Sequence, residues 1–383
     1  MKIAYDYEIF WKQRKFGGIS RYFSNLIKYI CKNKKLTTKI FSHLYFNANL
    51  STLSKDLIEG TKINYIPLFS GKIFEFYTKH VSNLKLLKFR PDIIHRTYFS
   101  NNFSIKEKTK LVITVYDLIH EIFSGNQKVK PKQTAVNLAD KIICISNNTK
   151  NDLINIYNIK PEKISVIYLG CEHMNINNLL SENSNNNKPY APYILYVGSR
   201  KKYKNFDFLL NAFSKSEKLM KDFNIILFGG ENITVQEIKK FKDLNFRENQ
   251  IIHIEGDDFI LKNLFSNARA YVFPSLYEGF GLSLIESMYL SCPVICSNIK
   301  TFIESAKDSV EYFDPKNYES IISSIEKVVY SNEYSKVLIK KGRERERAII
   351  DIEKPTEKKI LLEIMKCINQ KDIRKKSKIY QLA

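Results

Sequence analysis

The chain has 383 residues, of which 44% are hydrophobic and 13% aromatic, and its formal net charge is +21. This composition excludes wholesale disorder, and the length suits two domains better than a single core. No apolar run approaches the ~18 residues of a membrane span, and Asp6 and Glu8 interrupt the first segment, so we expect neither a span nor a signal peptide.

The strong positive charge indicates an anionic partner, and the candidates are nucleic acid, a membrane face and phosphorylated substrates. The sequence has neither zinc-finger spacing nor an RNP-type aromatic motif, which disfavours nucleic acid. The six cysteines form no C-x-x-C pair and no zinc-ligand spacing. We interpret them as reduced core thiols of a cytoplasmic protein.

The first predicted strand, Lys2 to Tyr5, leads into a loop that contains Gly17 and Gly18, and then into an amphipathic helix. Because glycine has no Cβ, such a pair lets the backbone come close to a ligand, but it equally suits a tight turn. Both interpretations stay open. Arg21, which follows in the same stretch, favours the ligand.

The segment from Gly71 to Arg90 combines apolar residues at helical spacing with several lysines. A helix of this kind can lie on an anionic membrane surface. Alternatively, its apolar stripe packs against the sheet while the lysines stay in solvent. The stripe consists of Ile73, Phe74, Tyr77, Val81, Leu84 and Leu87.

Two further apolar strands lead into polar side chains. One runs from Pro91 to His95, and the other, Leu111 to Val115, is followed by Asp117 and His120. Because ligands of parallel α/β sheets bind beyond the carboxyl ends of the strands, we expect these side chains to face a cleft. For His120, a structural hydrogen bond within the loop is the open alternative.

Helix caps explain two other polar positions. Ser146 precedes a predicted helix and is expected to cap it. The Asp257-Asp258 pair has the oxygen ligands of a divalent metal site, but its place before an apolar helix favours capping. We therefore predict no metal site.

The second half of the chain begins after an Asn-rich stretch that has little to bury and is typical of a linker. A strand from Ile194 to Val197 is followed by a basic loop, in which Arg200 and Lys204 stand where a diphosphate would meet positive charge. A later strand ends at Gly229, which we expect at another rim of the same pocket.

The most informative stretch is Ala270 to Cys296, which predicts a strand, a loop, a helix and a second strand. Unpaired backbone N–H groups where the glycine-rich loop enters the helix favour a phosphate, and a glutamate in the second turn can accept hydrogen bonds from a sugar diol. An ordinary helix with acidic residues near its positive end is the alternative. The residues concerned are Glu278, Gly279, Phe280, Gly281, Leu282 and Glu286.

The string PSLYEGFGLSLIESM closely resembles the donor-binding signature of family 4 glycosyltransferases, including its two glutamates eight positions apart. FGGISRY resembles the opening of these enzymes, GSRKKYKN resembles their G-x-R…K-N donor motif, and YFDP resembles a turn that follows their signature. These motifs occur in the family's order. At residue 116 the chain has Tyr where the family usually has His, so either Asp117 or His120 would take the role of that residue.

The resemblance implies an α/β protein with the GT-B fold, in which two doubly wound Rossmann-like domains face an interdomain cleft. Residues 1–174 would form an acceptor-binding domain, 175–190 a linker and 191–350 a nucleotide-sugar-binding domain. Residues 351–383 would form a helix that returns towards the first domain, followed by a basic tail.

The resemblance further implies a retaining hexosyltransferase that needs no cofactor and uses GDP-mannose or a UDP-sugar. Its acceptor would be a growing surface polysaccharide or a polyprenyl-diphosphate-linked glycan, handled in the cytoplasm or on the inner membrane face. Asp117, His120 and Glu278 are the expected catalytic residues, and His95 and Arg21 lie on the acceptor side. The expected donor-binding residues are Gly17, Gly18, Gly198, Arg200, Lys204, Asn205, Gly229, Gly279, Phe280, Gly281, Leu282 and Glu286.

Two other functions are compatible with parts of the sequence. A nucleotide-sugar epimerase of the same fold would release a free sugar isomer without an acceptor. A nucleic-acid-binding protein would explain the charge, but the glutamates of the signature loop would repel phosphates. A phosphorylase is disfavoured because we identify no lysine for pyridoxal phosphate.

Overall fold

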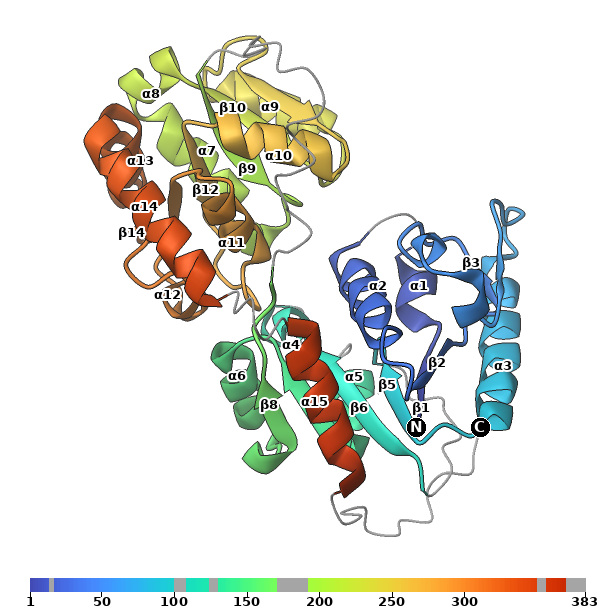
Figure 1. Ribbon diagram of the computed structural model, residues 1–383. Helices are drawn as coiled ribbons and strands as arrows, with labels where there is room; N and C mark the ends of the chain where they lie inside the picture. The colour runs from blue at the N-terminus through green and yellow to red at the C-terminus, as the bar shows by residue number, and fades with distance from the viewer. Residues whose placement is uncertain (14–16, 100–107, 124–129, 171–191, 350–355, 370–383) are drawn as a thin grey trace. The chain divides into compact units, whose positions relative to one another are not determined.

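The computed structural model describes residues 1–13, 17–99, 108–123, 130–170, 192–349 and 356–369 (Figure 1). The chain divides into two compact units, Met1–Ile167 with Glu353–Ala383 and Tyr168–Ile352. The C-terminal segment thus groups with the first unit, and the residues predicted as a linker, 175–190, lie outside the described part of the chain.

A parallel sheet of six strands forms the centre of the first unit. In spatial order its strands are β2 (Thr37–Ile40), β1 (Lys2–Tyr5), β5 (Ile93–Arg96), β6 (Lys110–Val115), β7 (Lys141–Cys144) and β8 (Ile164–Val166). A small separate sheet pairs β3 (Leu44–Tyr45) with β4 (Thr61–Lys62). The helices are α1 (Glu8–Lys12), α2 (Gly18–Ile30), α3 (Gly71–Phe89), α4 (Ile119–Phe123), α5 (Lys130–Leu138), α6 (Asn147–Tyr157) and α15 (Thr356–Asn369).

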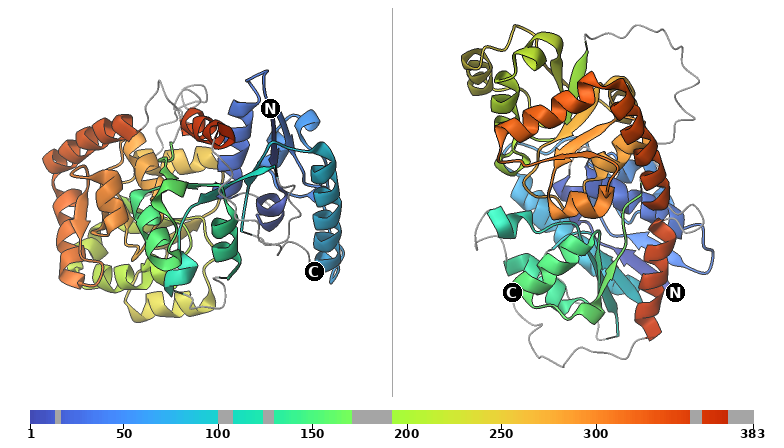
Figure 2. Two further views of the ribbon diagram at one scale, coloured as in Figure 1. Left: turned by 90° about the horizontal axis from the view of Figure 1, so that it is seen from below. Right: turned by 90° about the vertical axis from the view of Figure 1, so that its left-hand side faces the viewer.

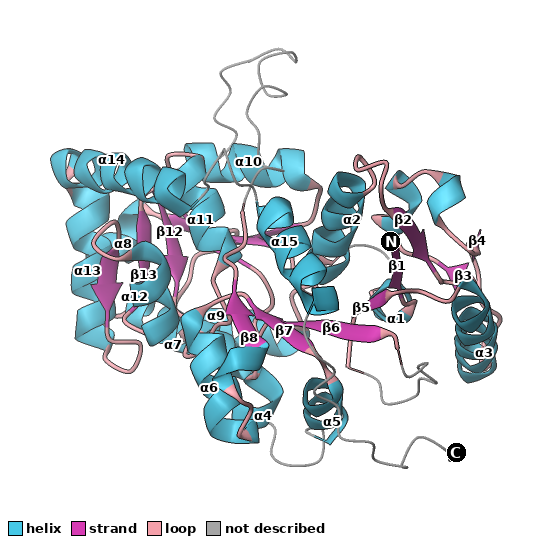
Figure 3. Cartoon of the chain, turned by 60° about the horizontal axis from the view of Figure 1, so that its bottom comes forward, coloured by secondary structure: helices cyan, strands magenta, loops and turns pink. Residues whose placement is uncertain are grey.

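Side chains of successive strand residues point to opposite faces of this sheet. Ile94 and Ile113 belong to the face that α3, α5 and α6 cover, where they pack in apolar clusters with residues of these helices. Helices α2 and α15 pack against each other on the other face (Figure 3). The sheet is therefore buried on both sides, as the near-continuous apolar strands predict.

The second unit is also built on a parallel sheet of six strands. In spatial order these are β11 (Ile251–Ile254), β10 (Asn224–Phe228), β9 (Tyr193–Val197), β12 (Ala270–Phe273), β13 (Val294–Ser297) and β14 (Glu311–Phe313). The helices are α7 (Phe206–Ser214), α8 (Glu217–Asp222), α9 (Val235–Asp243), α10 (Asp258–Asn267), α11 (Leu282–Tyr289), α12 (Lys300–Ala306), α13 (Tyr318–Tyr330) and α14 (Asn332–Ile349).

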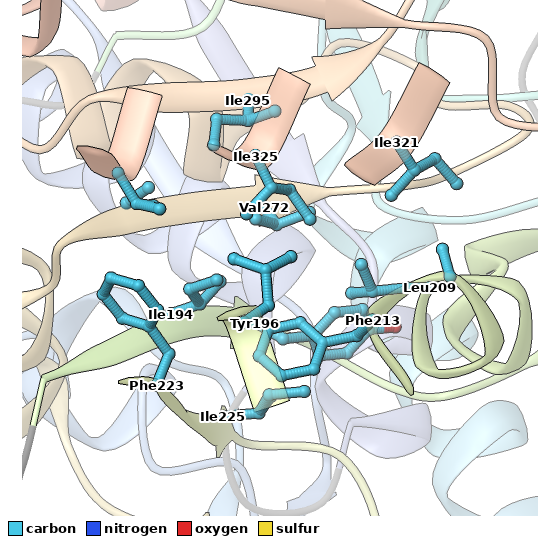
Figure 4. Close-up of a cluster of buried hydrophobic side chains, with 14 of the residues drawn as sticks. Ile194, Tyr196, Leu209, Phe213, Phe223, Ile225, Val272, Ile295, Ile321 and Ile325 are labelled. Carbon is cyan, nitrogen blue, oxygen red and sulfur yellow. The ribbon is translucent and has the colours of Figure 1, made fainter. Parts of the chain in front are cut away.

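The core of the second unit lies between its sheet and the pair α7 and α13 (Figure 4). Tyr196 and Val272 point into it from the two central strands and meet Phe213 of α7 and Ile325 of α13. The opposite face is covered by α10 and α11, since Tyr271 contacts the Phe265 ring and hydrogen-bonds the α11 residue Ser283. Figure 2 shows the helices on both sides of this sheet from two further directions.

Each sheet has a topological switch point, where the order in which the chain adds strands reverses. We call it the reversal point of the sheet. In the second unit, β9 lies between β10 and β12, so the chain first moves to one side of β9 and later continues on the other. In the first unit, β1 lies in the same way between β2 and β5. The loops that follow such neighbouring strands diverge and leave a crevice at the carboxyl edge, where open α/β sheets bind ligands.

Two predicted caps are confirmed. The Ser146 hydroxyl accepts a hydrogen bond from the N–H of Thr149 at the start of α6. One oxygen of Asp257 accepts from the N–H groups of Phe259 and Ile260, at 3.0 and 3.1 Å, and caps α10. Among the described residues, no three His, Cys, Asp or Glu side chains are grouped as a metal site requires.

The predicted helix over residues 71–90 forms, but it does not pack through the predicted apolar stripe. Its buried residues are Thr78, Ser82 and Leu86, whereas Ile73 and Leu84 are exposed. Small side chains allow the helix to approach its neighbours closely; for example, the N–H of His43 donates to Ser82 Oγ at 2.9 Å. No helix in the described part of the chain combines the length and the hydrophobicity needed to cross a bilayer.

Candidate active site

The basic loop after β9 is held in shape by two residues with left-handed backbone conformations. Gly198 has a φ of +115° and donates its N–H to the carbonyl of Phe228, at 2.9 Å. Asn205, at the end of the loop, has a φ of 57°, and its side-chain amide donates to the carbonyl of Pro315 at 2.8 Å. The Asn205 side chain thus ties the loop to the segment that follows β14, in addition to any contact with a ligand.

The loops after β9 and β12 meet at the reversal point of the second sheet. The N–H of Leu276 donates to the carbonyl of Tyr203 at 2.8 Å, which joins the two backbones. Lys204 Nζ lies 2.6 Å from Glu278 Oε1, and Ser275 Oγ donates to the same oxygen at 2.8 Å. Lys204 and Glu278, two predicted site residues that are 74 positions apart in the sequence, are therefore in direct contact.

The turn into α11 needs a glycine at residue 281. Gly281 has a φ of +82°, and a Cβ there would lie 2.8 Å from the Phe302 ring. The N-terminus of α11 receives no side-chain cap from its N-cap residue, Gly281. Its N–H groups are therefore the kind of donors that a phosphate can accept from. Leu282, an expected donor-binding residue, is the first residue of this helix.

The signature loop is anchored from behind by α12. Thr301 Oγ1 donates to the carbonyl of Glu278 at 2.7 Å, and Ser305 Oγ donates to the carbonyl of Phe280 at 2.9 Å. Gly279 and the Phe280 side chain are buried, and Glu286 is buried in the second turn of α11. Rigid backbone positions of this kind are what a precise ligand site requires.

Arg200 does not extend freely into the loop. Its Nε lies 2.5 Å from Glu237 Oε1, and its Nη2 donates to the carbonyls of Glu231 and Asn232, at 2.5 and 3.1 Å. Glu237 belongs to α9 and was not identified from the sequence as a site residue. Gly229 stands where β10 ends, with a φ of +72°, and donates its N–H to the carbonyl of Ile254 at 3.1 Å.

A pocket of about 240 Å³ lies at the carboxyl edge of the first sheet. Asp117 and His120, two predicted site residues, both line it. Asp117 Oδ1 accepts from the N–H of Ile119 at 3.1 Å, and Lys132 Nζ donates to the Asp117 carbonyl at 2.9 Å. Tyr116, which stands where the family usually has His, also lines the pocket. Lining residues that the sequence did not single out are Ile9, Lys12, Gln13, Ile19, Tyr98, Phe99 and Lys132.

The glycine pair lies beside this pocket, because Gln13 and Ile19 on either side of it are lining residues. Gly17 is the N-cap of α2, and Gly18 is its first residue. A Cβ added to Gly18 would meet no atom within 4 Å, so the backbone there is open to a neighbour. Arg21 is partly exposed one turn further along α2.

His95 does not face a cleft as expected. Strand β5 continues to Arg96, and the His95 ring points into the core, where it contacts the rings of Tyr5 and Phe23 at 5.5 and 5.1 Å. Its Nε2 lies 2.9 Å from Thr114 Oγ1. Burial lowers the pKa of His95 to about 3, so the ring is neutral at physiological pH. His95 lies near the carboxyl end of β5, as the sequence predicts, but Phe23 of α2 covers the face of the sheet to which its ring points.

A buried charged cluster at the reversal point of the first sheet was missed. Arg96 lies 3.7 Å from Asp6 and 3.6 Å from Glu8, and all three side chains are buried. Burial raises the pKa of Asp6, while the Arg96 charge acts in the opposite direction. Asp6 and Glu8 helped to exclude a signal peptide, but nothing in their spacing indicates an arginine about 90 residues away.

Known protein families match both halves of the chain. The family described as "Glycosyl transferases group 1" matches residues 180–345, and "Glycosyltransferase Family 4" matches residues 16–173. Over 269 residues the chain is 30% identical to the capsular polysaccharide biosynthesis glycosyltransferase CapH of Staphylococcus aureus, with 67% of each chain covered. The chain belongs to the family 4 glycosyltransferases.

A second protein is similar to the chain over part of its length. The chain is 31% identical over 192 residues to the O-antigen chain mannosyltransferase RfbU of Salmonella typhimurium, covering 49% of this chain and 51% of that one. The match thus spans about half of this relative. Among solved structures, Anabaena Alr3699/HepE in complex with UDP and glucose superimposes with a TM-score of 0.70 at 15% identity, over 96% of this chain and 99% of that one. This likeness confirms the predicted GT-B fold with its two Rossmann-like domains.

Proposed function

We propose that the protein is a retaining glycosyltransferase that moves a hexose from a nucleotide-sugar, GDP-mannose or a UDP-sugar, to a glycan or polyprenyl-diphosphate-linked acceptor. The observation that carries this proposal is the Lys204–Glu278 pair beside the N-terminus of α11, at the reversal point of a Rossmann sheet. The similar proteins, which include a mannosyltransferase and a protein solved with UDP and glucose, support it.

The chemistry required is the stabilisation of a leaving diphosphate. The bond between the sugar C1 and the diphosphate oxygen breaks, the acceptor hydroxyl oxygen bonds to C1, and its proton passes to a basic oxygen. Lys204, Arg200 and the N–H groups at the start of α11 would meet the charge that develops on the diphosphate. Glu286 would accept hydrogen bonds from the ribose, and Glu278 would orient both Lys204 and the transferred sugar.

We assign the acceptor to the pocket of the first unit. Asp117 and His120 line it together with the aromatic rings of Tyr98 and Phe99. Aromatic faces and a few polar groups are the usual components of a small-molecule site. In this proposal Asp117 faces the reacting hydroxyl of the acceptor.

The first experiment is a thermal-shift panel with UDP-, GDP- and dTDP-sugars, followed by transfer assays with the sugar that raises the melting temperature. Turnover should persist in EDTA, because protein cations supply the charge. Lys204→Ala should lower kcat/KM about 10²- to 10³-fold, the size of one oxyanion-type contact. Activity that EDTA abolishes and Mn²⁺ restores would overturn the metal-independent mechanism, and release of a free sugar isomer without an acceptor would indicate an epimerase.

We also propose that the first unit docks on an anionic membrane surface. Phe69 and Leu68 are almost fully exposed just before α3, and exposed Lys72, Lys88 and Arg90 provide positive charge on the same helix or at its end. Apolar side chains with flanking cations are the features of an interfacial segment. The other large apolar side chains exposed in this stretch are Tyr65, Ile73, Phe76, Tyr77 and Leu84.

Vesicle sedimentation tests this docking. The protein should bind vesicles that contain phosphatidylglycerol and leave them at high salt, because salt screens the attraction. The double variant Leu68→Ser, Phe69→Ser should bind about tenfold more weakly, since two apolar side chains no longer enter the interface. Phe259→Ser, an exposed phenylalanine of the second unit, is the matched control. Equal binding of wild type to neutral and anionic vesicles would remove the electrostatic part of the proposal.

A further inference from the structure

The side chain of Arg200 is held along one edge only. Its Nε and Nη2 atoms contact Glu237, with Nε–Oε1 at 2.5 Å and Nη2–Oε2 at 3.3 Å. Nη2 also donates to two backbone carbonyls, those of Glu231 and Asn232. A planar guanidinium fixed by several acceptors on one edge cannot rotate without breaking them together.

Among the residues that the structure describes, no acceptor contacts the other edge of the guanidinium. Within the described residues, Arg200 Nη1 is buried and has no hydrogen-bond partner. The whole side chain is only 6% exposed. A buried N–H group without a partner costs free energy, and an anion that accepts from Nη1 would remove this cost.

Backbone contacts explain why an α9 residue can reach Arg200. The glycine pair after β10 lies against the loop after β9, and a Cβ on Gly230 would be 2.8 Å from the carbonyl oxygen of Gly198. The loops can approach because no side chain separates them. Arg200, two residues after Gly198, therefore lies next to the first turn of α9.

Glu237 is itself fixed. It is the third residue of α9, and its Oε2 accepts from the N–H of Thr234 at 2.8 Å and from the Thr234 hydroxyl at 3.0 Å. In return, the Glu237 N–H donates to Thr234 Oγ1 at 3.2 Å, which completes a capping box. Although burial acts in the opposite direction, hydrogen bonds from Arg200 and Thr234 hold the pKa of Glu237 below its usual value. The carboxylate is thus charged and oriented before any ligand arrives.

We infer that Glu237 is a positioning residue of the donor site, which fixes Arg200 so that Nη1 is directed to a nucleoside diphosphate. This inference rests on the proposed function, since it assigns the diphosphate to the loop after β9. A flexible arginine loses side-chain conformational entropy when it binds a ligand. Because Arg200 is already held in place, less of this entropy is lost on binding. Lys204 differs, because a lysine is a point charge on a flexible stem and makes no planar contact.

The experiment measures binding of GDP and UDP to the full chain by isothermal titration calorimetry, together with KM values for donor and acceptor. Glu237→Ala should weaken binding of the preferred nucleotide about tenfold, a factor typical of one lost charge-assisted hydrogen bond. Glu237→Gln keeps an oxygen for Nε and should recover part of this loss. The KM for the acceptor should stay at the wild-type value, whereas a general loss of structure would change it as well.

Two controls separate positioning from other effects. Asp243→Ala removes the same charge from the exposed end of α9 and should leave nucleotide binding unchanged. In an Arg200→Ala background, Glu237→Ala should have no further effect, because the two residues act through one contact. A full additional loss in that background would mean that Glu237 acts by stabilising α9.

The outcomes distinguish a failure of the positioning role of Glu237 from a failure of the proposed donor site. If Glu237 only neutralises Arg200, its replacement will tighten nucleotide binding, and the inference is overturned while the proposed function stands. The same holds if Glu237→Ala binds like wild type. If wild type binds neither GDP nor UDP, the donor site itself is wrong, and both proposals fall.

Discussion

Glu278 and Glu286 have similar places in the sequence but different surroundings. Glu278 Oε1 lies 2.6 Å from Lys204 Nζ and accepts a hydrogen bond from Ser275 Oγ in the loop after β12, whereas Glu286 is buried one turn inside α11. Their spacing was readable from the sequence. The pairing with Lys204 was not, because it depends on two loops that the sheet order brings together.

The different surroundings predict different kinetic defects. Glu278→Gln should chiefly lower kcat, because it loosens the lysine that meets the developing charge, and a loss of about 10²-fold is expected. Glu286→Gln should chiefly raise the donor KM, because the ribose loses a charged acceptor. Both variants keep the side-chain shape, so circular dichroism should match wild type. Wild-type kcat/KM in both folded variants would mean that this loop is not the donor site.

His95 predicts a dependence of stability on pH. Its pKa is about 3 in the folded chain against 6.5 when unfolded, so between these values the unfolded chain binds more protons. Its contribution to stability is therefore complete above pH 6.5 and falls as the pH decreases towards 3. Compared with His95→Gln, which cannot titrate, the free energy of unfolding of wild type should decrease by about 2 kcal/mol more between pH 7 and pH 5. Urea unfolding at both pH values measures this difference. Parallel pH profiles of the two proteins would contradict the burial of a neutral ring.

At the scale of elements, the sequence predicted helices and strands better than the faces through which they pack. Periodicity identified α3, but the apolar stripe that it marks is not the packed face. Periodicity counts hydrophobic residues, whereas close packing also accepts small polar residues such as Thr78 and Ser82. The same limit applies to α9, whose T-x-x-E capping box is visible in the sequence although its contact with Arg200 is not.

Two leucines of α3 provide a test of which face packs. Leu86 is 2% exposed and belongs to the apolar cluster under the sheet, whereas Leu84 is 67% exposed. Leu86→Ala should destabilise the first unit by about 2–4 kcal/mol, because it leaves a cavity. Leu84→Ala should change stability by less than about 0.5 kcal/mol. Urea unfolding of both variants measures the difference, and equal effects would restore the predicted stripe as the packed face.

For the whole molecule, the alternation of apolar strands and helices predicted two doubly wound α/β units, because each unit is built from local strand–loop–helix repeats. The resemblance of the motifs to family 4 glycosyltransferases added the GT-B fold. Two features lay beyond this local pattern. The buried cluster of Arg96 with Asp6 and Glu8 joins segments that meet only through the order of the strands. The grouping of the C-terminal segment with the first unit, which only the family resemblance implied, depends on contacts that α15 makes with α2 and the sheet.

These contacts lead to a prediction that separates the two units. Glu363 of α15 lies 3.3 Å from Lys141 Nζ and accepts from Ser165 Oγ at 2.7 Å, so the helix is tied to β7 and β8. Ile364 is fully buried beside it, whereas Leu362 is 47% exposed on the same helix. Ile364→Asp places a charge in an apolar site and should destabilise the first unit by several kcal/mol, while Leu362→Asp should be close to neutral.

Differential scanning calorimetry and nucleotide titration measure the two effects together. In Ile364→Asp, one thermal transition should move to a lower temperature, while binding of GDP or UDP at room temperature stays at the wild-type value, because every residue of the proposed donor loops after β9 and β12 belongs to the second unit. Transfer to an acceptor should decrease, since the acceptor pocket lies in the first unit. Loss of nucleotide binding in this variant, with the Leu362→Asp control intact, would show that the donor site requires the first unit as well.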